Sequence, residues 1–372
     1  MIRKTKTSPV TTKGVRMEDI AREAGVSRRA VSRVLFPNGS RGVRVSEKTA
    51  LKIQEIAKRL GYLPNLSARQ LAGEKSHLVG VLIDSFGSAV SYLMLQQLER
   101  SMAALGYRLL IGQVHNDVDS IGEYLRDFTS RGVEGIISFV HHYPGHGAKI
   151  REIYRPMENV VCIGDSVVPG RENPAADTAR VDIAEGIRML VRHLHETGRR
   201  RIALFLSEGG YISAKVRELE FLSQIDALSL DPASCPVWSF RREEGKGPSR
   251  EAIHEGLSRL LSAHPETDAI IASNDLVALC TIQFLGLRGI GVPDRVAVTG
   301  FDNLELGWAS SPPITTVDQS PEQVAQKAIE LLLRRVGSPD AEPRSVSIPP
   351  RLIVRESTLP ATKKRTTSPP RP

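Results

Sequence analysis

The sequence predicts an α/β protein with a small helix-turn-helix head at its amino end and a two-lobed domain built on parallel sheets. Residues 17–33 have the pattern of two short helices joined by a tight turn, and from residue 78 short apolar runs alternate with helical stretches. Residues 1–80 contain 17 Lys and Arg against 6 Asp and Glu. The 372-residue chain carries a net charge of +8, so residues 81–372 sum to −3. A basic segment attached to an acidic body favours a polyanionic partner held by the amino-terminal part.

The first predicted helix covers about residues 16–24. Its apolar face is formed by side chains three and four residues apart, namely Ile20, Ala21 and Ala24. Gly25 ends this helix because glycine enters the left-handed backbone region without steric cost. Ser27 follows as the expected N-cap of the next helix.

The second predicted helix covers about residues 28–35 and has two unlike faces. At about 100° per residue, its apolar side chains share one arc: Ala30, Val31, Val34 and Leu35. The opposite arc carries Arg28, Arg29, Ser32 and Arg33. Arginine pairs bidentately with guanine O6 and N7 and also binds phosphates. This polar face therefore predicts DNA contact, although a charge run is more often simply a solvated helix face.

Five motifs follow one another at fixed spacing in this region. They are Asp19-Ile20-Ala21 with Ala24-Gly25-Val26-Ser27, Val31-Ser32-Arg33-Val34-Leu35, Val45-Ser46-Glu47-Lys48-Thr49, Leu60-Gly61-Tyr62-Leu63-Pro64-Asn65 and Ala68-Arg69-Gln70-Leu71. With them, residues 15–80 resemble the amino-terminal part of the LacI–GalR family of bacterial transcription regulators. The resemblance implies that Ser27, Arg28, Arg29, Ser32 and Arg33 contact bases or phosphates.

A third helix is predicted over about residues 46–60, and Pro64 separates it from a short segment that resembles the family's hinge helix. The resemblance implies hinge roles for Asn65, Ala68, Arg69 and Leu71. Leu71 matches a leucine that enters the minor groove and kinks the duplex. Packing of Leu71 against the sensor domain is the alternative. Ala68 would let two hinge helices approach closely, which implies a homodimer.

The resemblance extends to about residue 359 and implies a fold like that of periplasmic binding proteins. We expect a basic tail over 1–14, a DNA-binding domain over 15–62, a hinge over 63–76, an effector-binding and dimerisation domain over 77–359 and a second tail over 360–372. Both tails are expected to be disordered. The chain should cross between the two lobes near residues 176, 302 and 328. Ligands of open parallel sheets bind beyond the carboxyl ends of the strands, so the effector is expected between the lobes.

The resemblance also implies effector contacts at Arg217 and Asp275. Arginine supplies several donors and aspartate several acceptors, which together suit a hydroxyl-rich, sugar-like or mixed-charge small molecule. Asn274 is an equally good candidate for effector contact and for capping the helix after it. Asp84 ends the first apolar run and has either a cleft or a turn role. Asp302 has either a bracing or a ligand role, and bracing is favoured.

Other chemistries find little support. The three cysteines, Cys162, Cys235 and Cys280, are far apart in sequence and form no Cys-x-x-Cys site, which favours a reducing cytoplasm. Neither a Gly-x-Ser-x-Gly nucleophile motif nor a phosphate-binding loop appears. We expect no metal, no cofactor, no catalytic residues and no membrane association.

The sequence therefore predicts a cytoplasmic, nucleoid-associated DNA-binding regulator, a repressor that acts as a homodimer on a near-palindromic operator. A small-molecule effector between the lobes would change its operator affinity. A solute-binding receptor and a sugar-processing enzyme with an accessory DNA-binding head are the alternatives. Residues 1–75, with their DNA-binding pattern, argue against a solute-binding receptor. An enzyme would need an arrangement of catalytic residues, and none is visible in the sequence.

Overall fold

The computed structural model describes residues 15–36, 44–62, 75–83, 89–115, 117–139, 146–164, 176–208, 212–241 and 248–359. The chain divides into two compact units, Met1–His77 and Leu78–Pro372. In the described residues, the first unit is formed by three helices, and the second combines helices with the parallel sheets.

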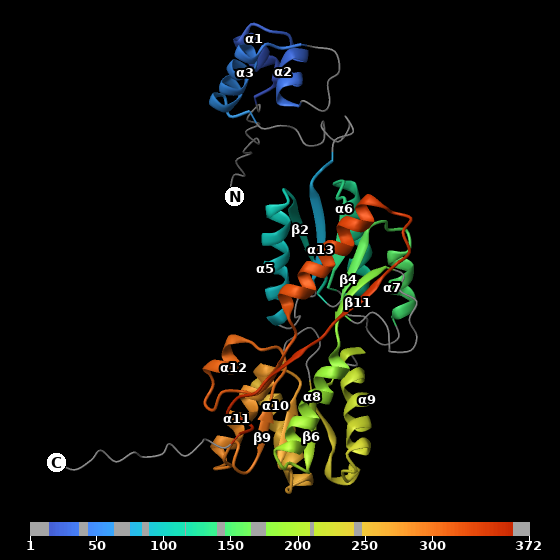
Figure 1. Cartoon of the computed structure of the whole chain (residues 1–372), viewed down its shortest axis with the longest axis vertical. Coiled ribbons are helices and arrows are strands. Elements are labelled where there is room, and N and C mark those ends of the chain that lie inside the picture. The colour runs from blue at the N-terminus through green and yellow to red at the C-terminus, as the bar shows by residue number, and fades with distance from the viewer. Residues whose placement is uncertain are drawn as a thin grey trace, which may run out of the picture. The chain divides into compact units, whose positions relative to one another are not determined.

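The first unit is built from α1 (Met17–Ala24), α2 (Arg28–Leu35) and α3 (Glu47–Arg59) (Figure 1). The three helices confirm those predicted from the sequence to within one residue at each end. Ile20, Val31 and Ile53, one from each helix, are each 0 % exposed. Each helix therefore contributes an apolar face to one small core, and the polar faces are left outside.

The second unit has two lobes, and the first lobe contains a 6-stranded parallel sheet in the order β11-β5-β4-β3-β1-β2. Its strands are β1 (Leu78–Ile83), β2 (Arg108–Gln113), β3 (Gly135–Ser138), β4 (Val160–Ile163), β5 (Asp177–Val181) and β11 (Ser345–Ile348). Helices α5 (Ala89–Ala104) and α13 (Pro321–Gly337) cover one face. Helices α6 (Val118–Ser130) and α7 (Gly147–Tyr154) cover the other.

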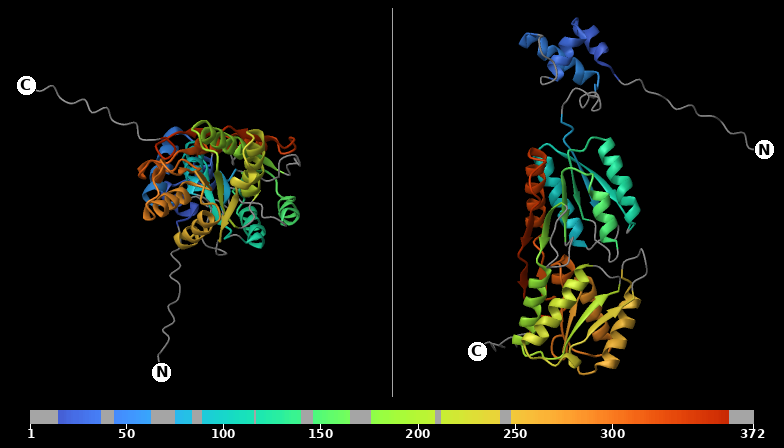
Figure 2. Two further views of the ribbon diagram at one scale, coloured as in Figure 1. Left: turned by 90° about the horizontal axis from the view of Figure 1, so that it is seen from below. Right: turned by 90° about the vertical axis from the view of Figure 1, so that its right-hand side faces the viewer.

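The second lobe repeats this arrangement around a 4-stranded parallel sheet in the order β7-β6-β8-β9 (Figure 2). Its strands are β6 (Ile202–Ser207), β7 (Val237–Phe240), β8 (Ala269–Ala272) and β9 (Ala297–Thr299). One face is covered by α8 (Ile183–Glu196) and α9 (Ile212–Ala227), and the other by α10 (Arg250–Ala263) and α11 (Asp275–Leu287). Smaller elements complete the lobe: the 3-10 turn η1 (Pro232–Ser234), α12 (Glu305–Ala309) and the antiparallel pair of β10 (Thr316–Asp318) with β12 (Arg351–Ile353).

The described chain crosses between the lobes in three places. These are between Val181 and Ile183, between Asp318 and Pro321, and between Ile348 and Arg351. The first lies within several residues of the predicted crossing near 176, but the predictions near 302 and 328 are wrong. Phe301 is 0 % exposed inside the second lobe, because the chain turns back there to form α12 and β10. Ala328 is 0 % exposed in the middle of α13, in the first lobe.

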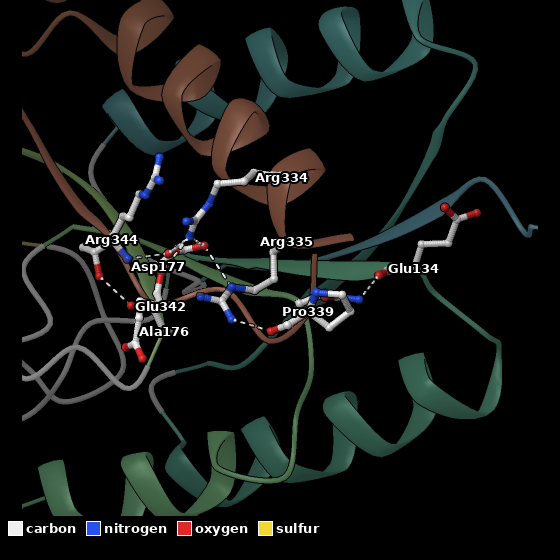
Figure 3. A network of polar contacts seen from close by, with 10 residues as sticks. Glu134, Ala176, Asp177, Arg334, Arg335, Pro339, Glu342 and Arg344 are labelled. Carbon is white, nitrogen blue, oxygen red and sulfur yellow. Dashed lines mark hydrogen bonds and ion pairs between the residues drawn. The ribbon is translucent and has the colours of Figure 1, made fainter. Parts of the chain in front are cut away.

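A buried carboxylate ties α13 to β5, the strand next to the edge of the first sheet (Figure 3). Asp177, the first residue of β5, is 0 % exposed. Arg334 Nη2 lies 2.7 Å and 2.9 Å from the two carboxylate oxygens, Arg335 Nε donates at 2.9 Å, and the Arg344 amide donates at 2.5 Å. Burial alone would raise the pKa of Asp177, but the hydrogen bonds from Arg335, the Arg344 amide and Arg334 together hold it below its usual range. The ionised carboxylate thus joins β5 to α13 and to Arg344, both of which are distant from it in sequence.

We expect Asp177→Asn to destabilise the protein by about 3–5 kcal/mol, because it leaves two mostly buried guanidinium groups without a counter-charge. Urea unfolding at neutral pH measures this change. Asp127→Asn is the matched control, since Asp127 pairs with Arg131 at the surface of the same lobe and should cost less than about 1 kcal/mol. Equal effects of the two substitutions would contradict the anchoring role of Asp177.

Candidate DNA-reading head and effector site

The turn between α1 and α2 is fixed by backbone geometry and by two local contacts. Gly25 has φ +70°, a conformation in which a side chain would be strained. The Ser27 hydroxyl accepts a hydrogen bond from the Ala30 amide at 3.2 Å and so caps α2, as predicted. Lys52 of α3 donates to the Ala24 carbonyl at 3.1 Å, which satisfies an acceptor at the end of α1. The direction of α2 is therefore set by the rest of the head.

The polar face of α2 lies outside the core of the head. Arg28 and Arg29 are exposed, and Ser32 and Arg33 are half-buried. On the opposite side, Val31 is 0 % exposed. The two faces lie as the sequence predicts, which brings Arg28, Arg29, Ser32 and Arg33 together beyond the Ser27 cap. Contact of these side chains with DNA stays a prediction.

Arg28 is also held by an acidic side chain that the sequence analysis did not single out. Its Nε lies 3.1 Å from Oε1 of Glu18, the second residue of α1. Both side chains remain well exposed, at 67 % and 50 %. Tyr62, which follows α3, lies close enough to feel both charges: burial raises its pKa, Glu18 raises it further, and Arg28 lowers it. Side chains from α1 and from the segment after α3 thus lie near Arg28, the first residue of α2.

Five predicted site residues lie outside the described part of the chain. They are the hinge residues Asn65, Ala68, Arg69 and Leu71, and the effector candidate Asp84. Their predicted roles are neither confirmed nor contradicted.

Arg217 lies on α9 with its guanidinium over an aromatic ring of the second lobe. The guanidinium carbon is 4.6 Å from the centre of the Phe301 ring, and Nη1 donates to the Ser213 carbonyl at 3.3 Å. Such stacking holds a cation in a fixed orientation. Arg217 also influences its neighbour Asp302, because its charge lowers the pKa of that carboxyl. The predicted effector residue therefore lies beside an acidic partner.

Asp275, the other predicted effector residue, is instead an internal anchor of the second lobe. It is 0 % exposed, and it accepts hydrogen bonds from the Thr316 hydroxyl at 2.6 Å and the Leu304 amide at 2.7 Å. A Cβ added to Gly300 would overlap Asp275 Oδ1, so the chain needs glycine there. Burial raises the pKa of Asp275 to about 6, against the effect of these hydrogen bonds and of the Arg355 charge. Both carboxylate oxygens therefore already accept hydrogen bonds within the protein, and effector contact by Asp275 stays a prediction.

Asn274 takes the capping role that the sequence analysis left open. Its Oδ1 accepts a hydrogen bond from the Val277 amide at 2.9 Å, which satisfies one free donor at the start of α11. The side-chain oxygen that could receive a ligand donor is therefore already used.

Asp302 is a second buried aspartate in the same part of the lobe. It is 3 % exposed and adopts φ 119°, a conformation that side chains rarely take. Gln319 Nε2 donates to Oδ1, and Oδ2 has no hydrogen-bond partner among the described residues. Burial first, and then the charge of Asp275, raises the pKa of Asp302 to about 8, although Arg217 and Gln319 oppose this. Strain and an unpaired buried oxygen are common at binding sites.

The candidate effector site therefore comprises Arg217, Phe301, Asp302 and Gln319. Gln319 belongs to the segment that crosses between the lobes, so this site is attached to a crossing. The sequence signal for Asp302 was Gly300-Phe301-Asp302, but the motif alone did not distinguish a brace from a ligand contact.

In the described part of the chain, His, Cys, Asp and Glu side chains form no cluster suited to a metal ion, and no helix combines the length and apolarity needed to cross a bilayer.

Two family models match the chain. The model of bacterial regulatory proteins of the lacI family matches residues 16–65, and that of a periplasmic binding protein-like domain matches residues 191–358. The HTH-type transcriptional repressor PurR of Mannheimia succiniciproducens is 26 % identical over 343 residues, which cover 92 % of this chain and 98 % of the relative. The HTH-type transcriptional regulator DegA of Bacillus subtilis is 27 % identical over 348 residues, which cover 92 % and 97 %.

Solved structures share the fold. The Lac repressor dimer bound to operator and the anti-inducer ONPF aligns with a TM-score of 0.80 and 23 % identity, covering 93 % of this chain and 100 % of that one. The complex of the transcriptional regulator CelR with cellobiose aligns with a TM-score of 0.64 and 23 % identity, covering 92 % and 99 %. Together with the family models, these matches place the helix-turn-helix head and the two α/β lobes in one known architecture.

Asp302→Asn tests the cost of the buried carboxyl. Its raised pKa means that the folded protein binds this proton more tightly than the unfolded chain, so stability should fall as the pH rises from about 4 to about 8 and level off above. Relative to the variant, the wild type should lose up to ~1.4 kcal/mol per pH unit across that window. Urea unfolding at pH 5 and pH 8 measures the difference, and parallel pH profiles for the two proteins would show that Asp302 is not a strained acid.

Proposed function

From the premise that the chain belongs to the LacI family of bacterial regulatory proteins, we propose that it is a transcriptional repressor that binds a near-palindromic operator as a homodimer. A small molecule in the second unit modulates its affinity for the operator. The observation that carries this proposal is the polar face of α2, which presents Arg28 and Arg29 to solvent while Val31 fixes the helix in the core. A helix so presented fits the major groove and offers guanidinium groups to guanine edges.

The DNA contact would continue beyond the head. Asn65, Ala68, Arg69 and Leu71 form the proposed hinge, in which Leu71 wedges into the minor groove between the two half-sites. A two-fold dimer would place one head on each half-site, which accounts for a near-palindromic operator.

We place the effector contacts at Arg217 and Asp302, with Gln319 as the link to the crossing segment. A small molecule that forms a hydrogen bond with Asp302 Oδ2 would give this buried oxygen a partner beside the Gln319 contact, which is made at Oδ1. Hydroxyl-rich molecules meet this requirement, since they donate and accept without bringing a charge into a buried site. The effector can shift the lobes only by as much as it binds one arrangement more tightly than the other.

A second copy of the chain would cover an apolar surface on the second lobe. Helix α11 contains one charged residue, Asp275, and that residue is buried. A helix that is apolar on every side belongs in an interior, yet Leu276 is 40 % exposed and Leu287 is 81 % exposed. Trp308 of the adjoining α12 is 61 % exposed. The exposed Arg288 and Glu305 adjoin these side chains, and an apolar surface of this kind can pair with a copy of itself across a two-fold axis.

The curated relatives are regulators and not enzymes. We therefore propose binding without turnover, in the cytoplasm where chromosomal DNA is available and in association with the nucleoid. Consumption of a candidate effector by the pure protein would instead favour the enzyme alternative.

Selection from a pool of randomised duplexes tests the proposed function. The full chain should enrich a near-palindromic site, with candidate effectors present or absent, because a dimer presents two identical reading heads. Arg29→Ala should weaken binding to the enriched site far more than binding to random duplex, since loss of a base contact removes ~1–3 kcal/mol of discrimination. Lack of any enriched sequence under either condition would overturn the proposal.

Leu287→Glu tests the dimer surface. A carboxylate buried without a partner at an interface costs ~2 kcal/mol or more, so the dimer dissociation constant should rise at least about 30-fold in sedimentation equilibrium. Leu222→Glu is the matched control: Leu222 is 43 % exposed on α9, which Figure 1 shows on the other side of the same lobe from α12. Dimers that are equally stable in both variants would contradict the assignment.

A further inference from the structure

The Glu18–Arg28 ion pair joins the first turn of α1 to the first residue of α2. The carboxylate meets the guanidinium at Nε, where Glu18 Oε1 lies 3.1 Å away. This contact is made at the Nε–H, on the side of the guanidinium nearest the aliphatic part of the side chain. Among the described residues, no hydrogen bond or ion pair occupies the outer edge, which is formed by Nη1 and Nη2.

Guanine offers two acceptors, O6 and N7, side by side in the major groove. A guanidinium that keeps both Nη groups available can donate to the two acceptors at once, provided its plane is held in the right direction. Arginine side chains are long and rotate about several bonds, so fixing that plane in advance lowers the entropy lost on binding. A carboxylate at Nε fixes the plane without occupying the donors that guanine needs.

We propose that Glu18 positions Arg28 for guanine and is thereby a specificity-determining residue of the reading head, an inference that rests on the proposed function. The ion pair contributes little to folding, because pairs between exposed side chains are worth ~0–1 kcal/mol. Glu23, on the same helix, pairs with Arg59 of α3 and so joins α1 to the supporting helix instead of the reading helix. Both are Glu–Arg ion pairs, but the Glu18 pair joins α1 to α2, whereas the Glu23 pair joins α1 to α3.

The negative charge of Glu18 has a second consequence. Affinity for DNA of any sequence comes mainly from phosphate neutralisation by Lys and Arg. Glu18 offsets the charge of Arg28 and opposes its use as a phosphate contact. Arg29, the next residue, makes no ion pair within the described part of the chain, so its charge is not offset in this way. Glu18 thus assigns Arg28 to base recognition and lowers binding to unrelated sequences.

The experiment measures full-chain binding to the selected operator, to every single-base variant of one half-site and to random duplex, over a range of salt concentrations. Glu18→Gln should reduce discrimination at one guanine position by a large part of the roughly 5–150-fold that a mismatched base pair costs. Affinity for random duplex should rise several-fold, with a salt dependence steeper by about one phosphate contact. Glu23→Gln removes the same charge from the same helix and should change the salt dependence without changing discrimination at that guanine.

Arg28→Ala should lose discrimination at the same position, and Glu18→Gln combined with Arg28→Ala should discriminate no worse than Arg28→Ala alone. This non-additivity separates positioning from a general electrostatic effect. A Glu18→Gln protein that keeps the wild-type base profile, or one that loses discrimination evenly at all positions, overturns the inference while the proposed function stands. A wild-type chain that prefers no sequence overturns the proposed function and this inference with it.

Discussion

The reading head depends on the division of α2 into a buried face and an exposed face. Val31 is fully enclosed between α1 and α3, and this contact decides which way the helix is turned about its own axis. Once that rotation is set, Arg28 and Arg29 must face solvent. Gly25 and Ser27 then fix the angle at which α2 leaves α1. The small core of the head thus determines the direction in which the guanidinium groups of α2 point, although they lie outside it.

A comparable constraint organises the corner where β9 ends in the second lobe. Asp275 binds the Leu304 amide and the Thr316 hydroxyl, and it packs against Gly300 so closely that no side chain would fit there. The neighbouring Asp302 is buried in the same corner but keeps an unpaired oxygen. One aspartate therefore stabilises the corner, and the other has an oxygen without a hydrogen-bond partner among the described residues, beside the segment that crosses between the lobes.

Apolar spacing and turn residues predicted the helices of the head well, whereas the positions of buried polar residues were not predicted from the sequence. The helices of the head followed from apolar spacing and from the Gly25 and Ser27 signals. The sequence analysis relied on short apolar runs to recognise strands, but β5 begins with Asp177 and contains no such run. Its burial depends on Arg334 and Arg335, which are far away in sequence. The misplaced crossings and the burial of Asp275 and Asp302 have the same cause, because contacts between distant residues decide them.

The central claim is that guanidinium groups of α2 read guanines in the major groove. Methylation interference on the selected operator tests this most directly, since methylation at guanine N7 removes the acceptor that arginine needs. The account predicts that interference is confined to a few guanines placed symmetrically in the two half-sites, and that methylation at one of them has no further effect on Arg28→Ala. Operator binding that is unaffected by guanine methylation, or affected equally at every guanine, would contradict it.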